Sequence, residues 1–365
     1  MVASFLTGRK QVVSIDGCLS REGQVTSGVP QGSSLGPLLF LIHVADIDAE
    51  CEHVTASSFA DDTRLTLPIA NTRDSEKMQS DLQKIYAWAN TNNMSFNSDK
   101  FELLRYRVTS APLGEYTTSS GVSISEVINL KDLGVILENT GGFKIHMTEC
   151  IHKSSNLASW VLRVFTSREP ELMITLFRAM VIPHLEFCCQ LWSPHLLGDI
   201  RRLEAVQRTF TARIKGIGHL NYWNRLKHLD LFSLERRRER YTIIYMYKII
   251  SGTVPNFSDG RFAIKTYKSV RGDLLCRVPA ISSGSTAKLR NMIEHSFAIR
   301  GPKLYNALPP ELRNFDGTKQ AFKLKLDKIL RFIQDKPCLS GYQQSAHSNS
   351  ITAQIAQLRA DGVFL

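Results

Sequence analysis

Long apolar stretches are absent from this 365-residue chain. No segment approaches the roughly 20 consecutive apolar residues that a membrane-spanning helix needs, and the longest one, around Gly36–Ala45, fits a buried helix better. The N-terminal segment has no basic region followed by an apolar one, so we expect no signal peptide. The sequence therefore predicts an intracellular protein, nuclear or cytoplasmic, that is not secreted and has no membrane partner.

Cysteine is sparse and irregularly spaced. The seven cysteines include no C-x-x-C pair, which removes the commonest zinc-knuckle signature. An odd number in a chain of this length is not typical of a disulfide framework, and reduced thiols are the preferred interpretation. One segment holds four residues of the types that bind zinc: His184, Cys188, Cys189 and His195. Two prolines interrupt this segment, and structural packing is the better interpretation of it. The same holds for His146, Cys150 and His152.

Acidic residues are in deficit, and the deficit is confined to one part of the chain. The formal net charge is +11. Residues 1–140 contain 11 basic and 17 acidic residues, whereas the rest of the chain contains 34 basic and 17 acidic ones. This asymmetry suggests a metal-using site attached to a polyanion-binding surface. Because a charge run is usually only a solvated face, the asymmetry supports nucleic-acid binding without establishing it.

The first part of the chain alternates between strand-like and helical patterns, which indicates an α+β unit. Leu38–Ile42 is apolar on every side and predicts a buried helix, with Ser33 or Ser34 as its N-cap. Apolar residues at helical spacing predict a second, amphipathic helix that starts near Asp74. An extended segment is expected at Gln11–Ile15, followed by a turn at Asp16-Gly17 and a second extended segment that ends at Val25. Further extended segments are expected at Arg64–Ile69, Phe101–Arg107 and Leu133–Leu137.

The part after residue 140 is mainly helical in pattern. Apolar residues from Ile200 to Ile214 mark one face of a helix whose other side is basic, and Ser233 can cap a further helix that begins with an arginine run. A Gly-, Ser- and Pro-rich stretch predicts a linker over residues 251–285. A small C-terminal module over residues 286–335 and a mobile tail over residues 336–365 are expected to follow.

Asp61-Asp62 is the dipeptide with the clearest chemistry. Adjacent side chains on a regular strand point to opposite faces, but on a tight turn two carboxylates can approach the same ions. Mg²⁺ prefers oxygen ligands, often one or two carboxylates plus substrate phosphates. Two such ions about 4 Å apart can activate a 3′-hydroxyl and stabilise a leaving pyrophosphate. Taken alone, however, Asp-Asp after a strand is more typical of ordinary turn chemistry.

The flanking segments reverse that balance. Ser27–Phe40, which reads SGVPQGSSLGPLLF, followed by Phe59-Ala60-Asp61-Asp62, strongly resembles the reverse transcriptases of non-LTR (LINE-type) retrotransposons, the jockey-like and chicken-repeat-like lineages most of all. The resemblance continues, in the order of the family, through Phe96–Lys100, Lys131–Val135, Pro183–Cys188, Leu191–His195 and Arg300–Pro309.

The resemblance implies a partial right-hand polymerase palm, an antiparallel sheet with helices, over residues 1–140, and a helical thumb over residues 141–250. Asp61 and Asp62 would be the paired metal-binding carboxylates of the palm, and Lys100 matches a position that could assist the leaving pyrophosphate. Leu133–Leu137 would belong to the primer-grip hairpin. Contacts with the template and the incoming nucleotide would come from Gly28, Pro30, Gln31, Gly32, Phe59 and Ala60.

The family also implies ligands and partners. The complete enzyme would use Mg²⁺ or Mn²⁺, an RNA template, a DNA primer and deoxynucleoside triphosphates; no oligomeric state follows. Nucleic-acid backbone contacts are expected from Arg201, Arg202, Arg208, Arg213, Arg236, Arg237 and Arg238. Nearby aromatic residues are expected in the core rather than as stacking platforms: Trp192, Tyr222, Trp223, Tyr241 and Tyr245.

One departure from the family bears on activity. A working palm needs another aspartate on an earlier strand, and Asp16 is no substitute because it lies in a predicted turn. Counterparts of the fingers are also missing. We therefore expect this chain alone to bind metal weakly and not to polymerise. The alternative is a non-catalytic nucleic-acid-binding remnant or domesticated protein. An unrelated metal-dependent phosphohydrolase is disfavoured because no further acidic or His cluster accompanies the Asp pair.

Overall fold

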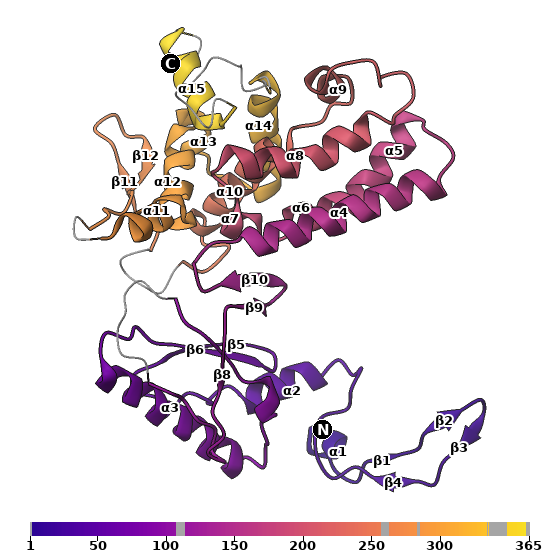
Figure 1. The fold of residues 1–365 in the computed structure, drawn as a ribbon, viewed down its shortest axis with the longest axis vertical. Coiled ribbons are helices and arrows are strands. Elements are labelled where there is room, and N and C mark those ends of the chain that lie inside the picture. The colour runs from indigo at the N-terminus through magenta and orange to yellow at the C-terminus, as the bar shows by residue number, and fades with distance from the viewer. Residues whose placement is uncertain are drawn as a thin grey trace. The chain divides into compact units, whose positions relative to one another are not determined.

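The computed structural model describes residues 2–106, 114–256, 263–282, 285–333, 335 and 349–362, and Figure 1 shows its ribbon. Helices and small sheets are both present, which confirms the α+β class. The chain divides into two compact units, Met1–Val127 (unit 1) and Ile128–Leu365 (unit 2). In the part that the structure describes, no helix combines the length and the apolar character needed to cross a membrane.

Unit 1 begins with a short helix and a long hairpin. At the hairpin tip, Asp16 (φ 49°) and Gly17 (φ 82°) both take the left-handed backbone conformation that tight hairpin turns require. The predicted turn is therefore confirmed. The elements are α1 (Val2–Leu6), β1 (Lys10–Gln11) paired with β4 (Gly23–Gln24), and β2 (Ser14–Ile15) paired with β3 (Cys18–Leu19).

Helix α2 (Gly36–His43) begins where expected, but the prediction that it is buried is wrong. The N-cap is Leu35 rather than a serine, so that part of the prediction is wrong, although Ser33 Oγ accepts the N–H of Gly36, the first residue of the helix, at 3.0 Å. Leu38 is 55% exposed and Ile42 is 64% exposed. The helix lacks a cover because the buried apolar residues of unit 1, within its described part, come from other segments: Val44, Ile47, Leu82, Ile85, Tyr86, Ala89 and Tyr116.

The main helix of unit 1 is α3 (Thr72–Thr91), which confirms the predicted amphipathic helix. Asn71 is its N-cap and accepts the Asp74 N–H at 3.1 Å. The strands of unit 1 are short, and each pairs with one partner only, so the described residues form separate two-stranded sheets rather than one palm-like sheet. The remaining elements are β5 (Thr55–Phe59) with β6 (Asp62–Thr66), the 3₁₀ helix η1 (Ser98–Lys100), and the parallel pair β7 (Glu102–Leu104) and β8 (Ser125–Val127).

Unit 2 starts with a hairpin that packs on helices. Strands β9 (Asn129–Asp132) and β10 (Val135–Glu138) belong to this unit, which therefore begins before residue 140. Met147, Phe177, Leu203 and Leu226 help form its first hydrophobic core. The helices of this core are α4 (Lys144–Val164), α5 (Pro170–Leu176), the π-helical turn η2 (Phe177–Val181), α6 (Ile182–Glu186), α7 (Cys189–Trp192), α8 (Leu197–Thr211) and α9 (Tyr222–His228).

A second core in unit 2 is built on α10 (Leu234–Ile250), whose predicted N-cap Ser233 accepts the Arg236 N–H at 3.0 Å. Two segments that pack in this core correct the predictions. Residues 251–285, predicted as a linker, include a hairpin that buries Cys276. Residues 336–365, predicted as a mobile tail, include a helix that buries Ile351 completely. The elements are β11 (Thr266–Lys268), β12 (Leu274–Cys276), α11 (Ala287–His295), α12 (Phe297–Ala307), α13 (Pro310–Arg313), α14 (Lys319–Phe332) and α15 (Ile351–Ala360).

Candidate metal and nucleic-acid site

The Asp pair lies at the tip of the β5–β6 hairpin. The strands pair in antiparallel register, with Phe59 opposite Asp62, so that Ala60 and Asp61 alone form the turn. Ala60 has φ 53°, a backbone conformation that side chains with a Cβ rarely adopt. A two-residue hairpin turn requires this conformation at its first central residue. The tight turn that a shared metal would need is therefore present.

Both carboxylates are open to solvent. Asp61 and Asp62 are exposed, and Phe59 is 66% exposed beside them. In the described segments, no three or more His, Cys, Asp or Glu residues come together as a set of metal ligands. A pair of carboxylates fits Mg²⁺ or Mn²⁺ in part, since such ions are often held by one or two carboxylates with waters and phosphates completing the shell.

The loop over residues 28–32 is held by a residue that the sequence reading missed. The Arg9 guanidinium donates to the carbonyl oxygens of Gly28 at 2.5 Å and Ser27 at 3.3 Å. Gly28 and Gly32 both have φ 76°, so glycine is required at each position. Gly28, Gln31 and Gly32 are exposed and Pro30 is half-buried, which leaves the loop backbone accessible to a substrate.

Lys100 ends the 3₁₀ helix η1 and is exposed. The segment around it is held by an aromatic cluster: the Tyr86 ring stacks on Phe101 with centroids 5.6 Å apart and meets the edge of Phe96 at 5.5 Å. Tyr86 comes from α3, so this helix fixes the segment that carries Lys100.

Asp81, also on α3, is a second residue that sequence reasoning missed. It is completely buried, and its carboxylate accepts backbone N–H groups from the segment that leads into β5. Burial opposes its ionisation, yet the N–H groups of His53, Val54 and Glu52, together with Lys84, hold the pKa of Asp81 below its ordinary value. A lone aspartate on an amphipathic helix gave no signal of this role.

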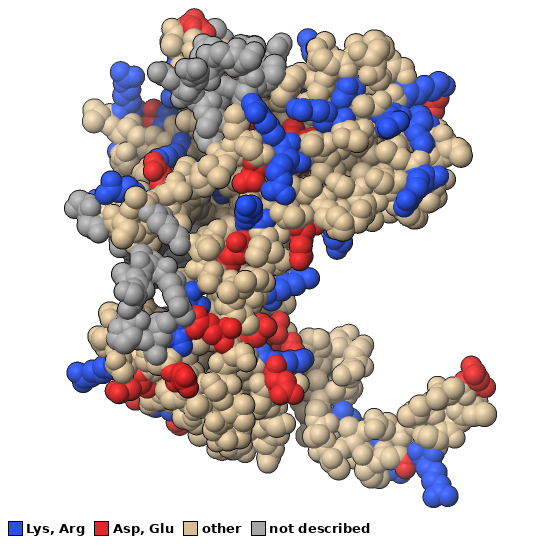
Figure 2. Space-filling view, in the orientation of Figure 1, with Lys and Arg blue, Asp and Glu red and all other residues tan. Residues whose placement is uncertain are grey.

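Four of the predicted nucleic-acid contacts lie on an open basic surface of unit 2. Arg201, Arg202 and Arg208 project from α8, Arg213 follows the helix, and all four are exposed. The Arg208 guanidinium lies 5.0 Å from the centroid of the Tyr222 ring. Lys and Arg side chains gather over the part of unit 2 that carries α5, α8 and α9 in Figure 2.

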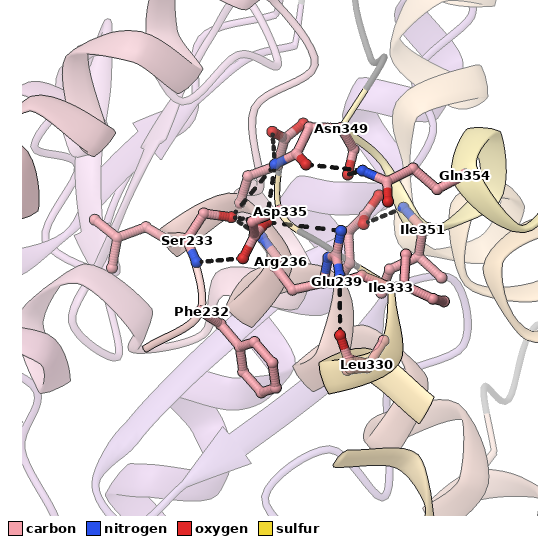
Figure 3. Close-up of polar contacts among 12 residues, drawn as sticks. Phe232, Ser233, Arg236, Glu239, Leu330, Ile333, Asp335, Asn349, Ile351 and Gln354 are labelled. Atoms are coloured by element: carbon pink, nitrogen blue, oxygen red, sulfur yellow. Dashed lines mark hydrogen bonds and ion pairs between the residues drawn. The ribbon is translucent and has the colours of Figure 1, made fainter. Parts of the chain in front are cut away.

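The prediction that Arg236, Arg237 and Arg238 contact nucleic acid is wrong for this structure. Arg236 and Arg238 are 0% and 1% exposed, and Arg237 is paired with Glu186. Figure 3 shows Arg236 directed at the end of α14. These side chains are buried because α10 runs between the two cores of unit 2, an arrangement that an arginine run in the sequence does not reveal.

Most of the residues considered for zinc are packed instead, and His152 is exposed. Cys189 is fully buried in the first core, and the His195 ring stacks on His295 at 3.6 Å. His146 Nδ1 accepts the Ile136 N–H at 3.3 Å. The six cysteines in the described segments are free thiols. The aromatic residues expected in the core are there, buried or packed against it: Trp192, Tyr222, Trp223, Tyr241 and Tyr245.

The part of the chain that carries this site resembles a known protein family. Residues 1–137 match the family described as reverse transcriptase (RNA-dependent DNA polymerase). The match includes the Ser27–Phe40 loop and helix, the Asp61–Asp62 turn and Lys100. This part of the chain is therefore related to reverse transcriptases, as the resemblance predicts.

Curated relatives narrow the relationship to mobile elements. The chain is 27% identical over 230 residues to the RNA-directed DNA polymerase from mobile element jockey of Drosophila funebris, which is 59% of this chain and 25% of that protein. It is 27% identical over 227 residues to a probable RNA-directed DNA polymerase from transposon X-element of Drosophila melanogaster, again 59% and 25%. The chain thus spans about a quarter of the length of these relatives. No solved structure matches it. The predicted kinship with jockey-like retrotransposon reverse transcriptases is confirmed.

Proposed function

We propose that unit 1 contributes the Asp61–Asp62 carboxylates of a nucleotidyl-transfer site of the reverse transcriptase type, whose parent reaction is DNA synthesis on an RNA template. The observation that carries this proposal is the placement of both aspartates at the exposed tip of the β5–β6 hairpin, with Asp61 in the two-residue turn and Asp62 as the first residue of β6, inside the family match. The left-handed backbone of Ala60 is what a two-residue hairpin turn requires in itself, so the family match, rather than the turn geometry, separates this proposal from ordinary turn chemistry.

The side chains divide the work as follows. Asp61 and Asp62 would hold a divalent ion, which when bound supplies charge neutralisation at the phosphates and activation of the primer hydroxyl. Ala60 keeps the turn small, so that primer and nucleotide can approach closely. The accessible backbone of the Gly28–Gly32 loop contacts the template strand, with Gln31 able to donate and accept hydrogen bonds. Lys100 would neutralise the leaving pyrophosphate.

For unit 2 we propose the role of a thumb. Helix α8 presents exposed arginines that can contact successive phosphates without reading sequence, and such contacts release counterions and weaken with salt. Within this proposal, residues 141–250 correspond to the thumb and residues 286–335 to the small C-terminal module. The partners are an RNA template and a DNA primer, with deoxynucleoside triphosphates as substrates of the complete enzyme.

A non-catalytic nucleic-acid-binding role is the second candidate, favoured by the absence of a third metal ligand near Asp61 among the residues described. Fluorescence anisotropy with a labelled RNA–DNA hybrid separates the two. Mn²⁺ should tighten binding by the unmodified chain but not by Asp61→Asn/Asp62→Asn if the Asp pair is a working metal site. Binding that ignores both the metal and this double variant would favour the non-catalytic role.

The thumb assignment has its own variants in the same assay. Replacing all four exposed arginines by glutamine should weaken hybrid binding and flatten its dependence on salt, because up to four phosphate contacts are lost. Affinity that is independent of salt in the unmodified chain would contradict the assignment. The variant set is Arg201→Gln, Arg202→Gln, Arg208→Gln and Arg213→Gln.

A further inference from the structure

The hairpin that carries the Asp pair has little hydrophobic support of its own. Of the residues in β5 and β6, only Ala56 and Leu65 are half-buried, and these two lie opposite each other across the strands. The two strands pair only with each other within the described residues. An isolated two-stranded hairpin is marginally stable in water. Its position must therefore be fixed by something other than burial of the strands.

A buried carboxylate provides that support at the open end of the hairpin. The Asp81 carboxylate accepts three consecutive backbone N–H groups: Glu52 at 3.1 Å, His53 at 2.7 Å and Val54 at 3.0 Å. Val54 is the residue directly before β5. Hydrogen bonds to a charged acceptor are shorter and about twice as strong as neutral ones. Three of them converging on one side chain fix the direction in which the chain enters the strand.

Lys84 completes the arrangement one helical turn later. Its ammonium lies 3.3 Å from Asp81 Oδ1 and 2.7 Å from Glu52 Oε1, so it bridges the helix and the anchored segment. Because a buried charge is costly unless it is paired and hydrogen-bonded, this set of partners explains why an aspartate can occupy a completely buried position of α3. An apolar residue at this position would leave three N–H groups without their acceptor.

We propose that Asp81 is the positioning residue for the Asp61–Asp62 turn: it ties the base of β5 to α3, and the strand transmits that placement to the tip. The five residues of β5 carry the chain about 17 Å from the anchor to the turn. The contacts of Asp81 involve neither metal nor nucleic acid. The inference rests on the proposed function only in assigning a catalytic purpose to the turn that Asp81 positions.

The test is NMR spectroscopy of the full chain with Asp81→Asn. Asparagine keeps one carbonyl oxygen, which can take the place of Oδ2, but it loses the charge and turns its N–H₂ group toward the Lys84 ammonium. The hydrogen bonds from His53 and Val54 then become neutral and weaker, so exchange protection of these two amides should fall by about tenfold. The amide signals of Ala60, Asp61 and Asp62 should shift and broaden. Glu76→Gln, which removes the same charge from an exposed position of the same helix, should leave both sets unchanged.

Signals from β7 and β8 serve as the internal control, because they report whether unit 1 as a whole stays folded. If Asp81→Asn keeps these signals and leaves the Ala60–Asp62 signals in place, the proposal is overturned. Should Asp81→Asn unfold, Asp81→Glu decides: it keeps the charge but moves it by one methylene, and must shift the tip signals in a folded chain. Failure of Mn²⁺ to bind at the tip would count against the proposed function while leaving the anchor intact.

Discussion

Arg236 and Asp335 cap each other's helices. The Arg236 guanidinium, in the first turn of α10, donates to the carbonyl oxygens of Leu330 at 3.3 Å and Ile333 at 2.6 Å, at the end of α14. Asp335, just beyond α14, accepts from the N–H and the hydroxyl of Ser233, each at 2.8 Å, at the start of α10. Both charges match the helix dipole that they face. Figure 3 shows the two caps side by side.

This relationship predicts a stability defect rather than a binding defect for Arg236→Ala. Removing one partner of a buried ion pair leaves an uncompensated charge, so the free energy of unfolding of unit 2 should fall by about 3 to 5 kcal/mol. Arg213→Ala, at an exposed position, should change it by no more than about 0.5 kcal/mol. Urea unfolding measures both. Weakened hybrid binding with unchanged stability would restore Arg236 as a nucleic-acid contact.

Helix α15 should behave as part of the core. Ile351 and Ile355 are completely buried, Glu239 accepts the Ile351 N–H at 2.7 Å, and Arg359 donates to the end of α12. Ile355→Ala should therefore lower the free energy of unfolding by about 2 to 5 kcal/mol. Thr352→Ala, on the exposed side of the same helix, is the matched control. Equal stability of the two variants in urea would show that the last helix does not pack as described.

Glu239 should make unit 2 lose stability as pH rises from acidic to neutral values. Burial, followed by the nearby Glu235 carboxylate, raises the pKa of Glu239 from 4.5 to about 8. The folded state thus holds a proton that the unfolded state releases, and stability falls as pH rises between these two values. Glu239→Gln keeps an acceptor for Ile351 and should flatten this dependence in thermal unfolding. Glu311→Gln, an exposed carboxylate with a side chain 75% accessible, should leave it unchanged.

The neutral form of His146 should hold the β9–β10 hairpin against α4. His146 Nδ1, on α4, accepts the N–H of Ile136 in β10. In the other direction, Glu138 Oε1 in β10 accepts the N–H of Ile145 on α4 at 2.8 Å. Burial lowers the pKa of His146, so its contribution is present above the ordinary value of 6.5 and is lost as pH falls through the lowered one. His146→Ala should cost about 1 to 3 kcal/mol and expose the Ile136 amide to hydrogen exchange. An Ile136 amide that exchanges at the same rate in both proteins would show that His146 does not hold the hairpin.

Local sequence signals predicted the local structure well. The Asp16-Gly17 turn, the start of α3 and the Ser233 cap each depend on residues within one turn of the chain, and all three are observed. The hairpin tip at Asp61 and Asp62 belongs to the same class, because the two-residue connection Ala60-Asp61 between the strands is a short-range property.

What the sequence could not predict depends on tertiary neighbours. The arginine run of α10 is buried because distant segments supply Asp335 and the end of α14. Helix α2 is apolar yet exposed, since no described segment covers it. Asp81 finds its three donors about thirty residues earlier in the chain. Periodicity marks which faces can be buried, but not which partner a charged side chain meets there.

Paramagnetic broadening by Mn²⁺ tests the central claim most directly, because it reports where the ion binds. We expect Mn²⁺ to broaden the amide signals of Phe59–Asp62 selectively in the unmodified chain, and Asp61→Asn/Asp62→Asn to abolish this effect while the β7–β8 signals stay as they are. Broadening that is spread over other acidic residues, or that persists at the turn in the double variant, would contradict a metal site at Asp61 and Asp62.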